Sequence, residues 1–243
     1  MNLIIPLVGS TLKRNLVKIL LLTCLIPLLL FIASLFSDDL LRIEGGDISF
    51  LSFSSLLFSM MHTIFIPVAL VIQLGVAMFY EEKSKELTYF YKDISRGKIY
   101  FSKLSVILLT YLVYCFVLFA VLVFTYFVVL SSDSRYSGDI FGATDKIDFL
   151  VLVISFLSDI IAIQIGVSLA LKFGPAYSIL GAFFYFVVSN ISLRYELVGQ
   201  LFIEYYVSAD DFIHSYVNAF VIFTCITILL QYRNMSVISK MEY

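Results

Sequence analysis

Asp159 is an acidic residue inside a long apolar stretch, where an acidic side chain is unexpected unless it has a structural or chemical role. It follows Asp148 by about 11 residues, or roughly 16 Å of helix at 1.5 Å per residue. An ionised Asp at the centre of a bilayer costs on the order of 2.5–3.5 kcal/mol, so such residues face a partner or a cavity. The candidate partners, which would together line a substrate path, are His62, Gln164 and Asn190. Three interpretations stay open: a neutral structural carboxyl, a polar wall of that path, and a proton-coupling site.

The segment Glu81–Lys98 combines charged side chains with an aromatic ridge. Acidic residues open the segment, basic residues close it, and three apolar side chains at i, i+3 and i+4 predict a short amphipathic helix. Such a ridge suits a groove on a partner protein, with the charges setting the register. A solvated loop that only anchors orientation is the alternative. The residues concerned are Glu81, Glu82, Glu86, Leu87, Phe90, Tyr91, Arg96 and Lys98.

Membrane spans are the elements that must position these residues. The chain is 61% hydrophobic and 14% charged, whereas soluble domains are about half apolar and a quarter charged. The net charge of −2 and the lack of a basic stripe give no sign of a nucleic-acid partner. We predict an all-α membrane protein with a single transmembrane domain over residues 1–243. The six stretches that approach the roughly 20 residues of a span are Ile19–Phe36, Leu57–Tyr80, Leu104–Leu130, Phe149–Leu171, Ala176–Leu193 and Ser215–Tyr232.

The distribution of basic residues predicts the orientation, because cytoplasmic segments are enriched in Lys and Arg. With both termini in the cytoplasm, only Arg42, Arg135, Lys146 and Arg194 fall on the outer side. Twelve of the 16 basic residues then lie inside: Lys13, Arg14, Lys18, Lys83, Lys85, Lys92, Arg96, Lys98, Lys103, Lys172, Arg233 and Lys240. We therefore expect a multi-pass protein with cytoplasmic N- and C-termini.

Two further segments have helical periodicity outside the spans. Leu3–Lys18 has apolar residues on one face and basic residues on another, which predicts an interfacial helix before the first span. Leu197, Leu201 and Tyr205 recur at spacing four in the segment before the last span, Arg194–His214. That spacing fits a short amphipathic helix, and a plain surface loop is the alternative.

A stripe of small residues follows one face of the fourth predicted span. Small side chains let helices approach closely in lipid, where packing drives association. The stripe therefore predicts close packing, either within the bundle or against another subunit. Its members recur every fourth residue: Ser158, Ala162, Gly166, Ala170 and Gly174.

The overall pattern resembles the permease subunits of ABC-2-type exporters. The resemblance rests on six spans, an amphipathic N-terminal helix, an acid-led inner loop, and Ile94-Ser95-Arg96-Gly97-Lys98-Ile99 leading through Ser102-Lys103 into the third span. It is closest in pattern to bacterial subunits of bacteriocin and lantibiotic immunity or antimicrobial-peptide export. The chain departs from the family at Lys85-Glu86-Leu87-Thr88, where a Gly-Thr pair is common, and at Asp93-Ile94, where a proline often precedes Ser-Arg.

This resemblance implies a set of partners. The segment Glu81–Lys98 would dock a separate cytoplasmic ATPase dimer, which would bind ATP and Mg²⁺, and a second permease subunit would complete the transporter. The segment before the last span would fold back as re-entrant helices. The sequence itself has no G-x-x-x-x-G-K-[ST] motif and so cannot bind ATP through a P-loop. The few fixed polar groups in the spans favour a hydrophobic or amphipathic peptide, or a lipid-like molecule, as cargo. Such an exporter would lie in the bacterial cell membrane and serve peptide secretion or self-immunity.

Two other functional classes are alternatives. A secondary transporter or channel centred on Asp159 would be expected to have inverted repeats and broken helices. An intramembrane enzyme would use Glu81-Glu82, which resembles the paired glutamates of CAAX-type membrane proteases; Glu86 then stands where that motif has Arg. No nucleophile–base pair or metal-ligand spacing supports an enzyme, and we expect no cofactor or metal on this chain.

Overall fold

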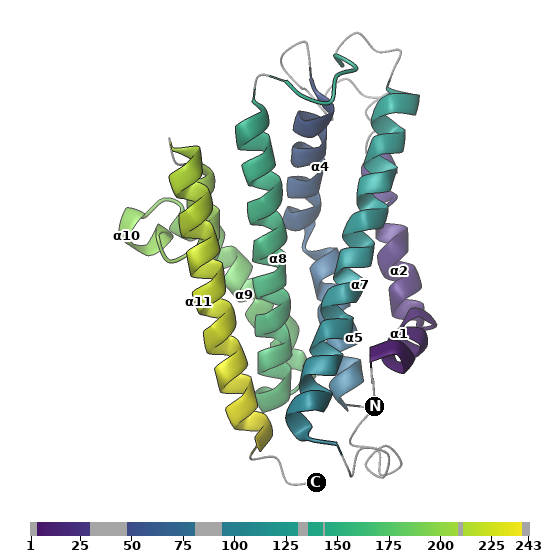
Figure 1. Cartoon of the computed structure of the whole chain (residues 1–243), viewed down its shortest axis with the longest axis vertical. Coiled ribbons are helices and arrows are strands. Elements are labelled where there is room, and N and C mark those ends of the chain that lie inside the picture. The colour runs from purple at the N-terminus through teal and green to yellow at the C-terminus, as the bar shows by residue number, and fades with distance from the viewer. Residues whose placement is uncertain are drawn as a thin grey trace.

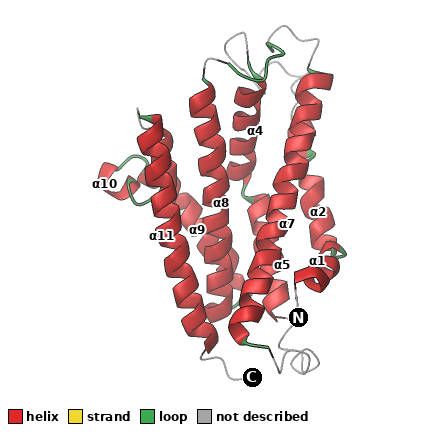
Figure 2. Cartoon of the chain, viewed as in Figure 1, coloured by secondary structure: helices red, strands yellow, loops and turns green. Residues whose placement is uncertain are grey.

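The structure is a computed structural model that describes residues 4–29, 48–80, 94–130, 136–142, 144–208 and 211–239. Within these ranges the regular elements are helices, and the long ones run side by side as one bundle (Figures 1 and 2). Among the described residues, four helical spans are long and apolar enough to cross a membrane, and the bent pair of α4 and α5 makes a fifth if it is one span. The expectation of an all-helical chain with several membrane-suited helices is therefore confirmed.

The N-terminal region forms two helices where the sequence predicted one interfacial helix over Leu3–Lys18. α1 covers Ile4–Leu12 and α2 covers Asn15–Thr23. Arg14 between them is extended, with ψ of 142°, and the chain changes direction there (Figure 1). Together with the turn that follows it, α2 forms an apolar helical segment that extends to Leu29. The rest of the first predicted span, residues 30–36, lies outside the described residues.

The second predicted span, Leu57–Tyr80, is wrong as a single straight helix. α4 begins earlier, at Phe50, and ends at Ile64, while α5 covers Ile66–Tyr80. Phe65 between them has a positive φ of 60°, and the two helices are bent by 53°. Pro67 in the first turn of α5 favours a break here, because it has no N–H to continue the ladder of α4 and its ring disfavours a continuous helix through the preceding turn.

α7 and α8 are the longest helices of the bundle. α7 covers Arg96–Phe124 and continues as the π-helix η2 over Thr125–Val129, so it begins before the predicted start at Leu104. α8 covers Asp145–Phe173 and is the most enclosed span, with 67% of its apolar window buried. It packs against α4, α5, α9 and α11. Because α8 is central, side chains on several of its faces contact other helices rather than lipid.

The C-terminal third contains two long helices and two short ones. α9 covers Pro175–Ser192 and α11 covers Phe212–Ser239. Between them, α10 covers only Glu196–Gly199 and the 3₁₀-helix η3 covers Ile203–Ser208. The amphipathic helix predicted over Leu197–Tyr205 is therefore wrong as one element. A Cβ at Gly199 would lie 2.5 Å from the Tyr205 ring and 3.0 Å from the Ser192 carbonyl oxygen, so the chain folds back on itself there.

The two ends of the bundle differ in charge. α5 and α8 finish at the lower end in Figure 1, where α7 begins and α11 also ends. Asp139, Asp145 and Asp148 lie near the opposite end, which we call the acidic end. The lower half of the bundle, which we call the basic end, contains the helix segments that carry all the described Lys and Arg residues except Lys146 and Arg194: Lys13, Arg14, Lys18, Arg96, Lys98, Lys103, Lys172 and Arg233.

Candidate functional site

Asp159 lies at the midpoint of α8, fourteen residues from both Asp145 and Phe173 (145 to 159 and 159 to 173), or roughly 21 Å from either end. Its carboxylate bridges two neighbouring helices. His62 Nδ1 of α4 lies 2.6 Å from Asp159 Oδ1, and the Tyr111 hydroxyl of α7 donates to Oδ2. The exposed fractions are 9% for His62, 4% for Asp159 and 0% for Tyr111. We call these three residues the mid-bundle triad.

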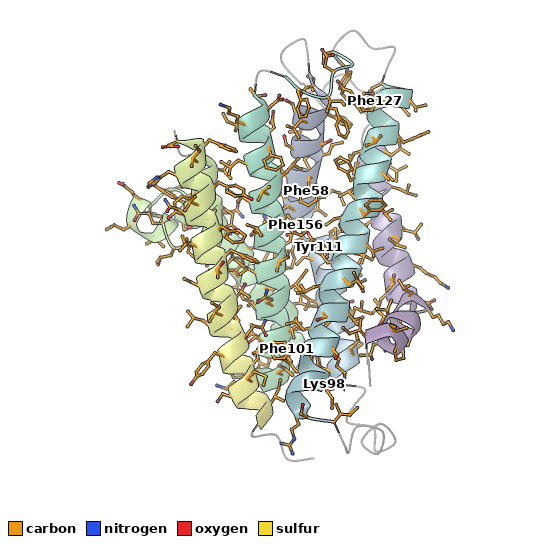
Figure 3. The ribbon with its side chains drawn as sticks, in the orientation of Figure 1. Phe58, Lys98, Phe101, Tyr111, Phe127 and Phe156 are labelled. Carbon is orange, nitrogen blue, oxygen red and sulfur yellow. The ribbon has the colours of Figure 1, made fainter. Side chains whose placement is uncertain are left out.

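Aromatic and apolar side chains enclose the mid-bundle triad. The His62 ring packs edge-on against Phe186 of α9 at 5.0 Å, and Tyr111 stacks on Phe156 of α8 at 5.8 Å. Figure 3 places Tyr111 and Phe156 together near the middle of the bundle. The crevice beside His62 and Asp159 is too narrow for a water molecule. The triad is therefore closed off from water, and in such surroundings its hydrogen bonds are strong and hard to replace.

The other two proposed partners of Asp159 lie elsewhere. Asn190 of α9 is exposed, and its side-chain amide donates to the Phe186 carbonyl oxygen at 2.8 Å. Gln164 is buried on α8, but its amide faces α11, where Nε2 lies 3.5 Å from Thr227 Oγ1. Of the residues that the sequence grouped along a substrate path, only His62 and Asp159 are in contact.

Gln164 belongs to a second set of hydrogen bonds, nearer the basic end. Its Oε1 accepts from Gln231 Nε2 of α11 at 3.3 Å, and Gln231 Oε1 accepts from the Tyr100 hydroxyl of α7 at 2.7 Å. Asn234 of α11 then joins two helices, because it donates to the Tyr100 oxygen at 2.8 Å and accepts from Ser168 of α8 at 2.6 Å. We call these side chains, with Thr227, the basic-end network: Tyr100, Gln164, Ser168, Thr227, Gln231 and Asn234.

A buried acidic residue joins η3 to the middle of α8. Ser158 donates a hydrogen bond to Glu204 Oε1, and Glu204 is only 9% exposed. The second carboxyl oxygen, Oε2, is buried and has no hydrogen-bond partner in the part of the chain that the structure describes. Because Ser158 precedes Asp159, two carboxyl groups approach the centre of α8 from different sides. The segment between α9 and α11 is thereby fixed against the middle of the bundle and not against its end.

The stripe of small residues on α8 lies mostly inside this chain. Ser158, Ala162 and Ala170 are 1–3% exposed. At Gly166, a Cβ would lie 2.8 Å from Ile72 Cγ2 of α5, so two helix backbones approach closely there. Gly174 ends the stripe at the turn into α9, where its φ of 100° suits glycine. A contact between this stripe and a second subunit stays a prediction.

The proposed docking segment is described only at its C-terminal part. Arg96 and Lys98 lie exposed in the first turn of α7, and Figure 3 shows Lys98 at the basic end. The remaining residues of that segment, Glu81, Glu82, Glu86, Leu87, Phe90 and Tyr91, lie outside the described residues.

The helices on either side of that segment are linked to each other. The ammonium group of Lys103 on α7 donates to the Met78 carbonyl oxygen near the end of α5 and lies 5.2 Å from the Phe79 ring. Lys103 is 2% exposed, so this is a buried contact. From the sequence, Lys103 was predicted only as one of the basic residues on the cytoplasmic side, in the segment that leads into the third span.

Comparisons of this chain with known proteins gave no match. No family model, no curated protein and no solved structure matches it. Within the described residues, no three His, Cys, Asp or Glu side chains are grouped closely enough to hold a metal ion.

An apolar groove opens on the surface between α8 and α9, toward the basic end. It has a volume of about 680 Å³. The Lys172 ammonium group lies 5.0 Å from the ring of Phe173, one of the lining residues. The lining is almost wholly apolar: Leu169, Phe173, Tyr177, Leu180, Gly181, Phe183, Phe184 and Val187. Such a surface suits an acyl chain, an apolar peptide side chain or another helix, and it offers few polar groups to orient a hydrophilic solute.

Tyr111 is the residue of the triad that the sequence analysis missed. Tyr is common in this chain, with 16 copies, so a single Tyr in an apolar span gave no signal. The sequence feature that could have identified Tyr111 is the face of the helix on which it falls. Tyr111 and Tyr114 fall on the same face as Ile107 and Leu118, and all four are buried. A Tyr on the buried face of a span has a hydroxyl that needs a partner, and Asp159 is an acceptor at similar depth.

Proposed function

We propose that this chain is a membrane-spanning permease subunit of an ATP-driven ABC exporter of the ABC-2 type. The observation that carries the proposal is the link between Lys103 and the Met78 carbonyl oxygen. This hydrogen bond joins α5, which precedes the segment 81–93, to α7, which follows that segment. A partner that moves this segment would therefore move α5 and α7 together, as a docked ATPase must do to drive transport.

Two other features support the same function. The basic end carries most of the described Lys and Arg residues, which favours a cytoplasmic location for that end and for both termini. The 3₁₀-helix η3 packs against α11 and reaches the middle of α8 through Glu204, while α10 packs against α9. This arrangement suits the re-entrant helices that the resemblance implies. We propose in full that the chain has six spans and lies in the bacterial cell membrane.

The proposed cargo is a hydrophobic or amphipathic peptide, or a lipid-like molecule. The groove between α8 and α9 is apolar, and the polar triad is closed to water. A hydrophilic solute would find few hydrogen-bonding groups on these surfaces. ATP and Mg²⁺ would be bound by the ATPase partner, and a second permease subunit, identical or homologous, would complete the path for peptide secretion or self-immunity.

The decisive experiment is co-purification of an ATPase subunit with the tagged chain. Changing Leu87, Phe90 and Tyr91 together to Ala should abolish that association, because the aromatic ridge would be lost. The matched control changes Ile140 and Phe141, which are 54% and 69% exposed at the acidic end, to Ala. The control should retain the ATPase. If the triple variant binds the ATPase as strongly as the control, docking through this segment is ruled out.

A second function, a secondary transporter centred on Asp159, is favoured by one observation. The span that carries His62 is broken next to the mid-bundle triad, and broken helices beside buried charged groups are typical of ion-coupled transporters. In proteoliposomes without any ATPase, this function predicts uptake driven by a proton gradient and abolished by Asp159→Asn. Transport that needs ATP and ignores the gradient would exclude it.

A further inference from the structure

The break between α4 and α5 holds a bulky residue in an unfavourable backbone conformation. Phe65 has φ of 60° and ψ of −8°, the left-handed region, and it is the only non-glycine residue with positive φ among the described residues. Glycine or asparagine usually occupies such positions, because a Cβ crowds the following carbonyl oxygen. Strain of this kind persists only where the surroundings impose it, and it is concentrated at sites that change conformation.

Contacts on the α4 side impose this conformation. Phe65 is 7% exposed, and its ring lies 5.6 Å from Phe183 and 5.8 Å from Phe186, both on α9. Three residues earlier, His62 packs on the same Phe186 ring and contacts Asp159. The last turn of α4 is therefore fixed to α8 and α9, and through Tyr111 to α7.

α5 runs at an angle of 53° to α4 and is held by a different set of contacts from the last turn of α4. It packs on α8 where Ile72 meets Gly166, and its far end is joined to α7 by the Met78–Lys103 hydrogen bond. The residues that follow α5 form the proposed docking segment. The break is thus the point at which a displacement of that segment would be converted into a change of angle at mid-bundle.

We propose that Phe65 is the pivot of a two-position hinge in this span, and that the mid-bundle triad is the latch that keeps the hinge bent. When the contact between His62 and Asp159 opens, Phe65 relaxes to a right-handed conformation and α5 moves toward the axis of α4. The inference rests on the proposed function for its purpose, because the hinge would link the docking segment to the centre of the membrane. Its geometry can be tested without any ATPase.

The test is a distance measurement between two nitroxide labels in the full chain in lipid nanodiscs. The labels replace Leu56 of α4 and Gln73 of α5, both exposed, after Cys24, Cys115 and Cys225 have been changed to Ala. The bent chain should give one short distance. Asp159→Asn, which weakens the latch, should add a longer component that approaches the roughly 25 Å spanned by 17 residues of straight helix.

Two further variants keep the test decisive. Pro67→Ala restores an N–H to the start of α5 and leaves the three triad side chains unchanged, so it should add the same longer component. Ser168→Ala removes a buried hydrogen bond of the basic-end network and should leave the distance unchanged. An unchanged distance in both Asp159→Asn and Pro67→Ala would overturn the hinge. Loss of the hinge would leave ATPase docking untouched, and failure of the docking experiment would leave the hinge untouched.

Discussion

Gly166 of α8 lies directly against Ile72 of α5: a Cβ added at Gly166 would lie 2.8 Å from Ile72 Cγ2 and 2.9 Å from Cδ1. Real Cβ atoms almost never come so close to another heavy atom. The two helices therefore pack at a separation that only glycine permits at this position. A second close approach lies at Gly75 of α5, where a Cβ would lie 3.2 Å from Val167 Cγ2 of α8. Since Ile72 is fully buried, it cannot easily move aside.

Gly166→Ala should consequently destabilise the protein. Overpacking a well-filled site typically costs about 1–3 kcal/mol, and we expect a lower midpoint of thermal unfolding in detergent. Gly9→Ala is the control, because nothing lies within 4 Å of a Cβ at Gly9. Adding Ile72→Val to Gly166→Ala should recover part of the loss. A double variant no more stable than Gly166→Ala would contradict this account of the contact.

Tyr111→Phe should also destabilise the protein, because Asp159 would keep a buried oxygen without its donor. Leaving a buried polar group unsatisfied costs roughly 1–3 kcal/mol. Tyr232→Phe, at a position that is 79% exposed, removes a hydroxyl without this consequence and serves as the control. Unfolding by denaturant in mixed micelles measures both. Equal stability of the two variants would mean that the hydroxyl of Tyr111 contributes nothing to the triad.

The hydrogen bond between Ser168 and Asn234 should give a modest coupling energy. Double-mutant cycles of hydrogen bonds between membrane helices average about 0.6 kcal/mol, with a maximum near 1.7 kcal/mol. We expect a value in that range from Ser168→Ala, Asn234→Ala and the double variant. Asn234→Ala alone should cost more than Ser168→Ala, because Asn234 also binds Tyr100. Equal costs for the two single variants would argue against the bridging role of Asn234.

Membrane-impermeant maleimide labelling should report the orientation. Phe141→Cys at the acidic end should be labelled in intact cells, because that position is 69% exposed. Lys172→Cys at the basic end, which is also exposed, should be labelled only after permeabilisation. Both variants are made in a chain without native cysteines. The reverse pattern would place the basic end outside and remove the basis for cytoplasmic docking.

The sequence predicted the all-helical fold class better than it predicted where helices bend. Hydropathy averages over about 20 residues, so Leu57–Tyr80 looked continuous, although Pro67 marks the place where its ladder must fail. The left-handed conformation at Phe65 has no local signal, because it is imposed by rings on α9 that are distant in the sequence. Similarly, spacing alone could not show that the backbone reverses at Gly199.

The polar site was predictable only in part, for a related reason. Depth along a span can be counted from the sequence, and that count made His62 a reasonable partner for Asp159. Helix rotation cannot be counted in the same way. Asn190 is exposed on α9 and Gln164 faces α11, so residues of similar depth lie on different sides of their helices. Glu204 lay in a segment that the sequence assigned to the outer side, yet η3 brings it to the middle of α8.

α11 illustrates how a helix can have a defined rotation with little packing. Only 11% of its apolar window is buried, so dispersion forces hold it weakly to the rest of the bundle. Gln231 and Asn234 nevertheless determine which of its faces is turned inward, because amide hydrogen bonds are directional while apolar contacts are not. Its outward face, with Ile228, Leu229 and Tyr232 between 61% and 79% exposed, therefore has a fixed composition. Lipids or a neighbouring helix could exchange on that face without the helix turning about its axis.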